Sequence, residues 1–141
     1  MISMKRTTFR LLLLATLVAC GSVTSREVAR FPQSASQPEL ERLLPEMKAG
    51  FPEKRGKALK LALVHPHGFP SAEAGKTHRR INVWVGIERT SATGNQCVVE
   101  MHDYEQTKTD DGWTPPKWTG RSSPDEERDQ TGIIACAKLV K

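Results

Sequence analysis

The chain has 141 residues, 26% of them charged, and its 21 Lys and Arg residues exceed its 16 Asp and Glu residues, which gives a formal net charge of +5. This length is enough for one modest domain with its own core. The first 19 residues contain three cations and no acid, so the other 122 residues carry 18 cations, 16 acids and a net charge of +2. So small a charge does not indicate a nucleic-acid partner.

The first segment of the chain has a basic start and an apolar middle. Three cations precede or adjoin an apolar run at residues 11–19, and no acid occurs before Glu27. This run of nine residues is too short to span a bilayer, which takes about 20 apolar residues. A positive start, a short apolar middle and small residues before the cut are typical of a secretory signal peptide, so we expect residues 1–19 to be removed on export.

The end of that segment, residues 17–20 (LVAC), resembles the lipobox of bacterial lipoproteins. In that family the cysteine thiol receives a diacylglyceryl group, the signal is cut just before it, and the new amino terminus is usually acylated, for example with palmitate. The resemblance implies that Cys20 becomes the lipid-bearing first residue of a membrane-anchored protein, because two or more acyl chains give stable anchoring. Gly21, in place of an Asp after the cysteine, implies the outer membrane and a domain facing the periplasm. Alternatively, Cys20 is an incidental residue near a conventional cleavage site.

Two cysteines remain once Cys20 carries lipid, namely Cys97 and Cys136. Because an exported protein meets a compartment that permits disulfides, we expect these two to pair. The bridge would close a loop of about 40 residues and stabilise the fold by about 4 kcal/mol on the chain-entropy model. Two buried free thiols or half of a metal site are the alternatives, and a thiol nucleophile is the least favoured use.

A helix is expected from Ser36 onward. Ser36 and Glu39 have the spacing of a capping box. The apolar face of the helix has helical spacing and consists of Leu40, Leu43, Leu44 and Met47. We expect Pro45 to kink or split the helix and Gly50 with Pro52 to end it.

Three or four strands follow this helix. The clearest is residues 80–88, where Ile81, Val83, Val85 and Ile87 recur with the period of a strand. Gly94 and Asn95 suit a tight hairpin turn, because both tolerate positive φ. The other expected strands are residues 57–64, which would also suit a short helix, 96–106 and 133–140. In the returning strand, Cys97, Val99 and Met101 alternate with Glu100, His102 and Tyr104.

The predicted fold class is α+β, with one N-terminal helix packed on a small, mostly antiparallel sheet of three to four strands and a disulfide pinning the whole. Residues 111–120 (DGWTPPKWTG) are expected to form a loop, because Pro115 and Pro116 cannot donate to a strand ladder. Residues 20–35 contain few apolar side chains and favour a flexible tether. The expected organisation is therefore signal peptide, tether and a single periplasmic domain at 36–141.

The sequence contains no motif that indicates catalysis. The only set of residues that suggests metal binding is His65, His67, His78 and His102. Pro66 and Gly68 place the first pair in a loop, so we favour a solvated turn and expect no metal or cofactor. No G-x-S-x-G or comparable glycine-rich element supports a hydrolase. The acid-rich residues 123–129 (SPDEERD) fit an exposed helix start better than the paired carboxylates of a glycosidase.

The loop with two tryptophans is the strongest candidate for a binding surface. Trp113 and Trp118 flank two prolines and Lys117, and exposed indoles are unfavourable unless they pack against something. Packing against the protein's own sheet is the favoured interpretation, and contact with a glycan or a protein partner is the alternative. Four residues on the predicted outer face of the sheet would extend such a surface, although an ordinary solvent face is favoured for them: Trp84, Glu100, His102 and Tyr104.

These observations support three functions from different classes. The favoured one is a non-enzymatic binding module at the periplasmic face of a membrane, acting on another envelope protein as assembly partner, inhibitor or immunity factor. The second is a lipoprotein that binds peptidoglycan or another glycan through Trp113 and Trp118. The third is a small envelope hydrolase that uses one of the histidines.

Overall fold

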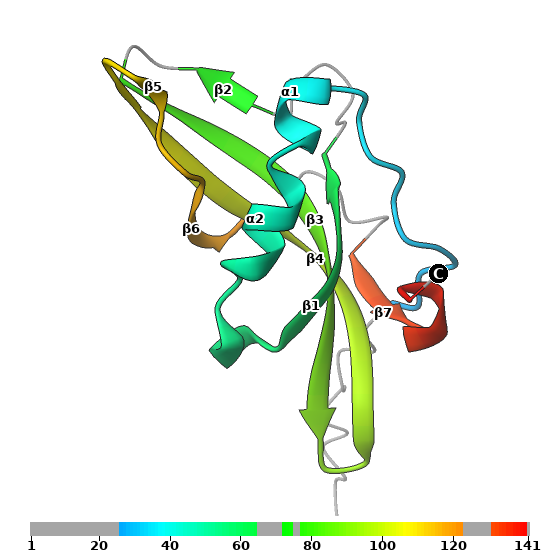
Figure 1. Cartoon of the computed structure of the whole chain (residues 1–141). Coiled ribbons are helices and arrows are strands. Elements are labelled where there is room, and N and C mark those ends of the chain that lie inside the picture. The colour runs from blue at the N-terminus through cyan, green and yellow to red at the C-terminus, as the bar shows by residue number, and fades with distance from the viewer. Residues whose placement is uncertain (1–25, 65–71, 75–76, 123–130, 141) are drawn as a thin grey trace, which may run out of the picture.

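The computed structural model describes residues 26–64, 72–74, 77–122 and 131–140 of the chain (Figure 1). The predicted signal peptide, Cys20, His65, His67 and the SPDEERD segment lie outside these ranges. Within them, no helix is long and apolar enough to cross a membrane.

The fold is built around a long, twisted antiparallel hairpin of β3 and β4 (Figure 1). β1 and the short β2 pair with β3, while β5, β6 and β7 pair with β4, and all of these pairings are antiparallel. The strands are β1 (Lys57–Leu63), β2 (Ala72–Ala74), β3 (His78–Ser91), β4 (Gly94–Thr109), β5 (Gly112–Trp113), β6 (Lys117–Arg121) and β7 (Gly132–Ile134). The helical segments are α1 (Pro38–Glu41), α2 (Leu44–Ala49), and the 3-10 turns η1 (Glu53–Arg55) and η2 (Cys136–Lys138).

The residues predicted to form the hairpin explain its register and its turn. The β-branched residues of β3 alternate along the strand, and β3 pairs with β4 from His78 opposite Thr107 to Ser91 opposite Gly94. The turn uses one residue with positive φ, Gly94 at 119°, whereas Asn95 does not share that conformation. The strong alternation thus fixes the register, and a single glycine closes the turn.

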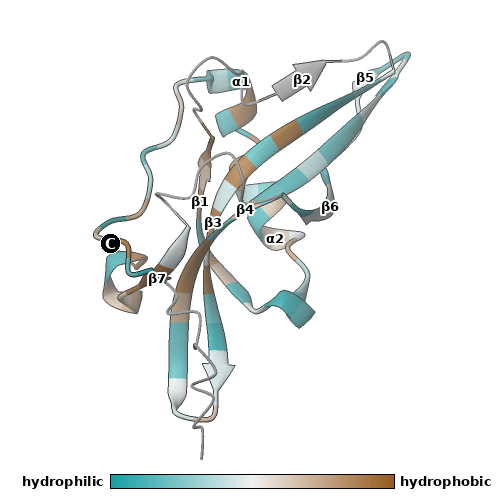
Figure 2. Ribbon diagram, turned by 180° about the vertical axis from the view of Figure 1, so that it is seen from behind, coloured by the Kyte–Doolittle hydropathy of each residue, from teal (hydrophilic) through white to brown (hydrophobic). Residues whose placement is uncertain are grey.

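Both faces of the hairpin are buried, which corrects the expectation of one solvent-facing side. On one face, Val83 and Val85 pack with residues of α1 and α2. On the other, Trp84 and Val99 pack with a second cluster that includes Val28 from the first described segment. Figure 2 shows hydrophobic residues gathered along the middle of the hairpin, with hydrophilic ones toward its turn. The molecule therefore has two separate cores. We call the one under α1 and α2 the first core and the one that contains Trp84 the second core.

The segment expected to be a flexible tether packs into both cores. Val28 and Phe31 are buried in the second core and Ala35 in the core under α1 and α2, and Glu27 forms a parallel bridge with Ile133 of β7. The expectation failed because it was based on the few apolar residues of a mostly polar stretch. These three residues are three and four positions apart, a helical spacing, yet residues 26–37 form no helix and are held by packing against the sheet. The packed domain begins by residue 26, well before the predicted boundary at residue 36, so the helix is not the N-terminal element that was predicted.

The helix starts later than predicted and is divided in two. The residue at the N-cap of α1 is Gln37, which makes no side-chain capping bond, so the Ser36 capping box does not form. Pro38 occupies the first turn, where its fixed φ suits a helix start and its missing N–H costs nothing. Pro45 similarly lies in the first turn of α2, and Gly50 caps its end, which confirms the predicted split and stop.

Two other predictions about the second half of the chain are corrected. The sheet has more strands than expected, because Pro115 and Pro116 fall between β5 and β6 and neither has to donate within a strand. The expected last strand, residues 133–140, ends at Ile134. The chain then turns into η2, whose Leu139 packs back into the second core.

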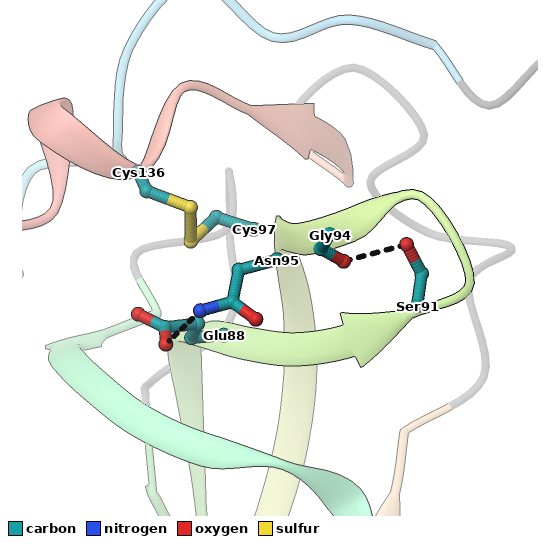
Figure 3. Close-up of a disulfide and its surroundings, with 6 residues drawn as sticks. All are labelled: Glu88, Ser91, Gly94, Asn95, Cys97 and Cys136. Atoms are coloured by element: carbon teal, nitrogen blue, oxygen red, sulfur yellow. Dashed lines mark hydrogen bonds between the residues drawn. A yellow bond between two sulfur atoms is a disulfide. The ribbon is translucent and has the colours of Figure 1, made fainter.

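The predicted disulfide between Cys97 and Cys136 is confirmed (Figure 3). It joins β4 to η2 across a sequence separation of 39 residues, with Cα atoms 5.2 Å apart. The Glu88 carboxylate lies near both sulfurs but accepts a hydrogen bond from the Asn95 side-chain amide at 3.0 Å. Because the two sulfurs are bonded to each other, the free-thiol and half-metal-site alternatives do not apply.

Candidate functional site

An open groove lies between the helical segment and the sheet, on the face of the hairpin that α2 covers. It has a volume of about 800 Å³. Its lining comes from α2, η1, the start of β1 and the end of β3, and consists of Lys48, Ala49, Phe51, Glu53, Lys54, Arg55, Gly56, Lys57, Ala58, Glu88, Arg89 and Thr90. We call this the basic groove.

The groove carries an excess of positive charge. It has five cations and two acids, a formal charge of +3 within one depression. Lys48, Lys54 and Lys57 are exposed, and in the described part of the chain none of them lies within 4.0 Å of a carboxylate oxygen. One of the two acids, Glu88, is engaged with Asn95. Three ammonium groups therefore face solvent without an ion-pair partner among the described residues.

A glycine allows this cluster to form. Gly56 has φ of 113° and connects η1 to β1. A Cβ there would lie 2.7 Å from the Glu88 carbonyl oxygen and 2.7 Å from the Ile87 side chain. Because only glycine tolerates both the conformation and the close approach, the turn can press against β3 and bring Lys57 opposite Glu88.

Beneath the groove lies a buried carboxylate, Glu100 of β4, whose side chain is 6% exposed. It pairs with Arg89 at 2.8 Å and with His102 at 3.0 Å, and Arg121 lies 3.9 Å away. Burial would raise the pKa of Glu100, but the hydrogen bonds from His102 and Arg89 and the charges of Arg89 and Arg121 outweigh it. The net effect lowers the pKa of Glu100 from 4.5 to about 2.

The imidazole of His102 is held from both sides. The Trp118 indole N–H donates to Nδ1 of His102 at 3.1 Å. Because an indole nitrogen only donates, Nδ1 must be the acceptor and Nε2 must carry the proton that is donated to Glu100. The ring is fully buried, and the Phe51 ring packs against it at nearly a right angle with centroids 5.0 Å apart. Since Phe51 also lines the groove, this network forms the support of the groove floor.

Two groove cations are tied to the same support. Arg55 lies over the Trp118 ring at 5.7 Å, and the Arg89 guanidinium donates to the Arg55 carbonyl at 2.9 Å. Both ring nitrogens of His102 are used in structural hydrogen bonds, and no solvent reaches the ring. The pair of Glu100 and His102 is therefore arranged to hold the groove in place and not to exchange protons with a substrate.

The residues predicted to form an outer surface lie inside the molecule. Trp84 is 2% exposed and belongs to the second core, while His102 and Tyr104 are fully buried on the opposite face. The prediction failed because α2 covers the polar face of β4. There the Tyr104 hydroxyl donates to the Met47 carbonyl at 2.7 Å, and burial raises the pKa of Tyr104.

The two tryptophans of the predicted loop have separate partners. Trp118 packs against the first core and bonds to His102, as the favoured interpretation expected. Trp113 is half-buried, with the Arg79 guanidinium 4.5 Å and the Lys108 ammonium 5.4 Å from its ring centroid. Lys117 is exposed on β6. His78, another residue of the histidine set, is exposed on β3 and bonds to Thr77.

The groove cations were missed by the sequence analysis, although a signal exists. Four of them lie in the ten residues 48–57 (KAGFPEKRGK), which contain a single acid. The fifth, Arg89, is 32 residues further on and joins them only through the pairing of β1 with β3. The local charge density could have been noticed, but the contribution of β3 needed the sheet register.

Comparison of the chain with protein-family models, curated proteins and solved structures gave no match in any of the three. The function of the groove is therefore argued from its own residues.

Proposed function

We propose that this protein is a lipid-anchored envelope lipoprotein that binds an acidic segment of another envelope protein in the basic groove, without catalysis. The observation that carries the proposal is the set of three exposed lysines, Lys48, Lys54 and Lys57, which have no ion-pair partner in the described part of the chain and surround one depression with a net charge of +3. Charges of one sign gathered in a concave site attract and orient a ligand of opposite sign.

The floor of the groove supports this interpretation. Phe51 and Ala58 are buried apolar residues that line it, so a ligand would meet both an apolar floor and a charged rim. That combination suits a peptide with carboxylates and apolar side chains, because interfaces combine an apolar centre with a polar edge. The hydrogen-bonded network below keeps Phe51 fixed, which limits the entropy lost on binding.

Protein binding is favoured over glycan binding because of the surroundings of the tryptophans. Sugar recognition would need open indole faces, but Arg55 lies over Trp118 and two cations lie against Trp113. The hydrolase alternative loses one of its four histidines, because His102 is fully buried. The basic groove needs neither open rings nor a reachable imidazole.

Anchoring by lipid is proposed from the LVAC sequence at residues 17–20. The disulfide between Cys97 and Cys136 supports an oxidising compartment, where such bonds persist. Two acyl chains on Cys20 would hold the groove near other envelope proteins and raise its effective encounter rate with them.

A charge-reversal experiment tests the groove. Processed protein carrying Lys54→Glu with Lys57→Glu is compared with the wild type and with Arg42→Glu plus Lys117→Glu, exposed cations outside the groove. The probe is a fluorescent peptide of ten glutamates, followed by anisotropy at 50 and 200 mM salt. We expect the wild type and the control to bind similarly and more weakly in high salt, and the groove variant to bind at least about tenfold more weakly.

Equal binding by the two variants would contradict a role for the groove. The same three proteins are then used to retain partners from an envelope extract. A protein kept by the wild type and the control but lost from the groove variant would identify the partner. For the anchor, the mass of the processed N-terminal peptide should include fatty acyl groups on Cys20, and an unmodified thiol there would refute it.

A further inference from the structure

The first described residues and the end of the chain meet on the side of the sheet opposite the groove. Lys138 donates from Nζ to the Ala29 carbonyl at 2.6 Å, and the Lys60 ammonium lies 5.4 Å from the centroid of Phe31. In Figure 1, β7 and the C-terminal end lie on one side of the hairpin and α2 on the other, and Figure 2 shows the same separation from behind.

This side of the molecule presents three cations and one exposed apolar residue. We call it the N-terminal pole and define it by Arg30, Lys60, Lys138 and Val140. None of its three cations has a carboxylate within 4.0 Å in the described ranges, and Val140, 76% exposed, is the only large hydrophobic residue so exposed there. Glu27 is the one acid in the first described residues, 26–31. Cations and an exposed apolar side chain on the same side of a domain match the interface of a bilayer, where phosphates lie above acyl chains.

The length of chain before the pole is short. Only five residues lie between Cys20 and Arg26, the first described residue, so this stretch of six Cα–Cα steps reaches at most about 20 Å. A tether of residues 20–35, as the sequence predicted, would have allowed about 50 Å and free tumbling. The shorter reach favours contact between the membrane and the side of the domain from which the chain emerges.

We infer that the N-terminal pole lies on the phosphate headgroups of anionic phospholipids, and that the basic groove consequently faces away from the bilayer toward its partner. The inference rests on the proposed lipid anchor at Cys20. It follows from the two-core arrangement, because Phe31 and Leu139 belong to the core on the pole side and Phe51 to the core on the groove side. The sheet between them separates the two basic surfaces.

Lysine acetylation tests this orientation without any mutation. Processed, acylated protein is placed in vesicles of phosphatidylethanolamine and phosphatidylglycerol and in non-ionic detergent micelles, pulsed with acetic anhydride, and analysed by mass spectrometry. Lys60 and Lys138 report on the pole, and Lys54 and Lys57 are the matched controls in the groove. We expect acetylation of the pole lysines to be about fivefold slower in the vesicles than in micelles, and that of the groove lysines to be unchanged.

The outcomes distinguish this inference from the anchor. The orientation would be overturned if, in anchored protein, the groove lysines were protected as much as Lys138 or the pole lysines were not protected. Either result would leave the anchor standing. An unmodified thiol at Cys20 would overturn the anchor and the inference with it. In phosphatidylcholine vesicles, which have no net charge, the protection of Lys138 should fall by more than half, and equal protection in both lipids would overturn the role of anionic headgroups.

Discussion

Replacing Glu100 by Gln should destabilise the protein strongly at neutral pH. Glu100 uses one carboxylate oxygen to accept from Arg89 and the other to accept from His102. Glutamine has only one acceptor oxygen, so its amide nitrogen would face one of these two donors. One buried hydrogen-bonding group would be unsatisfied and the ion pair with Arg89 would be lost.

The pKa of Glu100 gives the magnitude. Its value of about 2 in the folded protein lies below the ordinary 4.5, so the folded state favours the carboxylate. A difference of this size corresponds to about 3 kcal/mol of stability. Because the folded pKa is depressed, this stability is present in full above pH 4.5 and is lost as the pH falls toward 2. The variant should therefore unfold about 3 kcal/mol more easily at pH 7, and the difference should shrink through this window.

Urea unfolding followed by tryptophan fluorescence at pH 7, 5, 4 and 3 measures both effects. The matched control is Glu105→Gln, an exposed carboxylate on the same strand, for which a change within about 0.5 kcal/mol is expected. The reasoning would be refuted if Glu100→Gln were as stable as the wild type at pH 7, or if its deficit were the same at pH 3.

Cys97→Ser and Cys136→Ser should each lower the free energy of unfolding by about 4 kcal/mol, and the double variant by no more than either, as measured in urea; clearly unequal losses would argue against a shared bond. Gly132→Ala should cost about 2 kcal/mol or more, because the new Cβ would lie 1.9 Å from the Arg26 carbonyl oxygen and push the first described residues off β7. Gly50→Ala, whose Cβ meets nothing closer than 3.5 Å, is its control in the same thermal unfolding assay, and equal melting temperatures for the two would contradict the packing of this segment.

The hairpin and the disulfide were predictable because each depends on a simple constraint. Along β3 the β-branched residues recur every second position, and only an extended strand places all of them on one side. Once Cys20 is assigned to lipid, Cys97 and Cys136 have only each other as partners among the cysteines. Neither inference needs knowledge of distant parts of the fold.

The second buried face could not be predicted by the same means. The polar residues of β4 suggested solvent, yet each has a partner from elsewhere in the chain: Tyr104 finds the Met47 carbonyl and Glu100 finds Arg89. On the other face, the residues that pack with Trp84 include Val28 and Phe31, which come from a stretch that forms neither a helix nor a named strand. Burial of a polar strand face is decided by whether distant groups can satisfy it, and periodicity contains no information about those groups.

In the candidate site, one side chain links the charge of the groove to the stability of the core. Arg89 lines the basic groove and also neutralises the buried Glu100, so the charge of the groove and the stability of the core share a residue. Removing Arg89 would leave a buried carboxylate without its closest cation and would weaken the fold together with the binding. Lys54 and Lys57 have no such second role, because they are exposed and have no ion-pair partner in the described ranges. Loss of acidic-peptide binding in a variant of these two lysines, with unfolding unchanged, would therefore report on the groove alone.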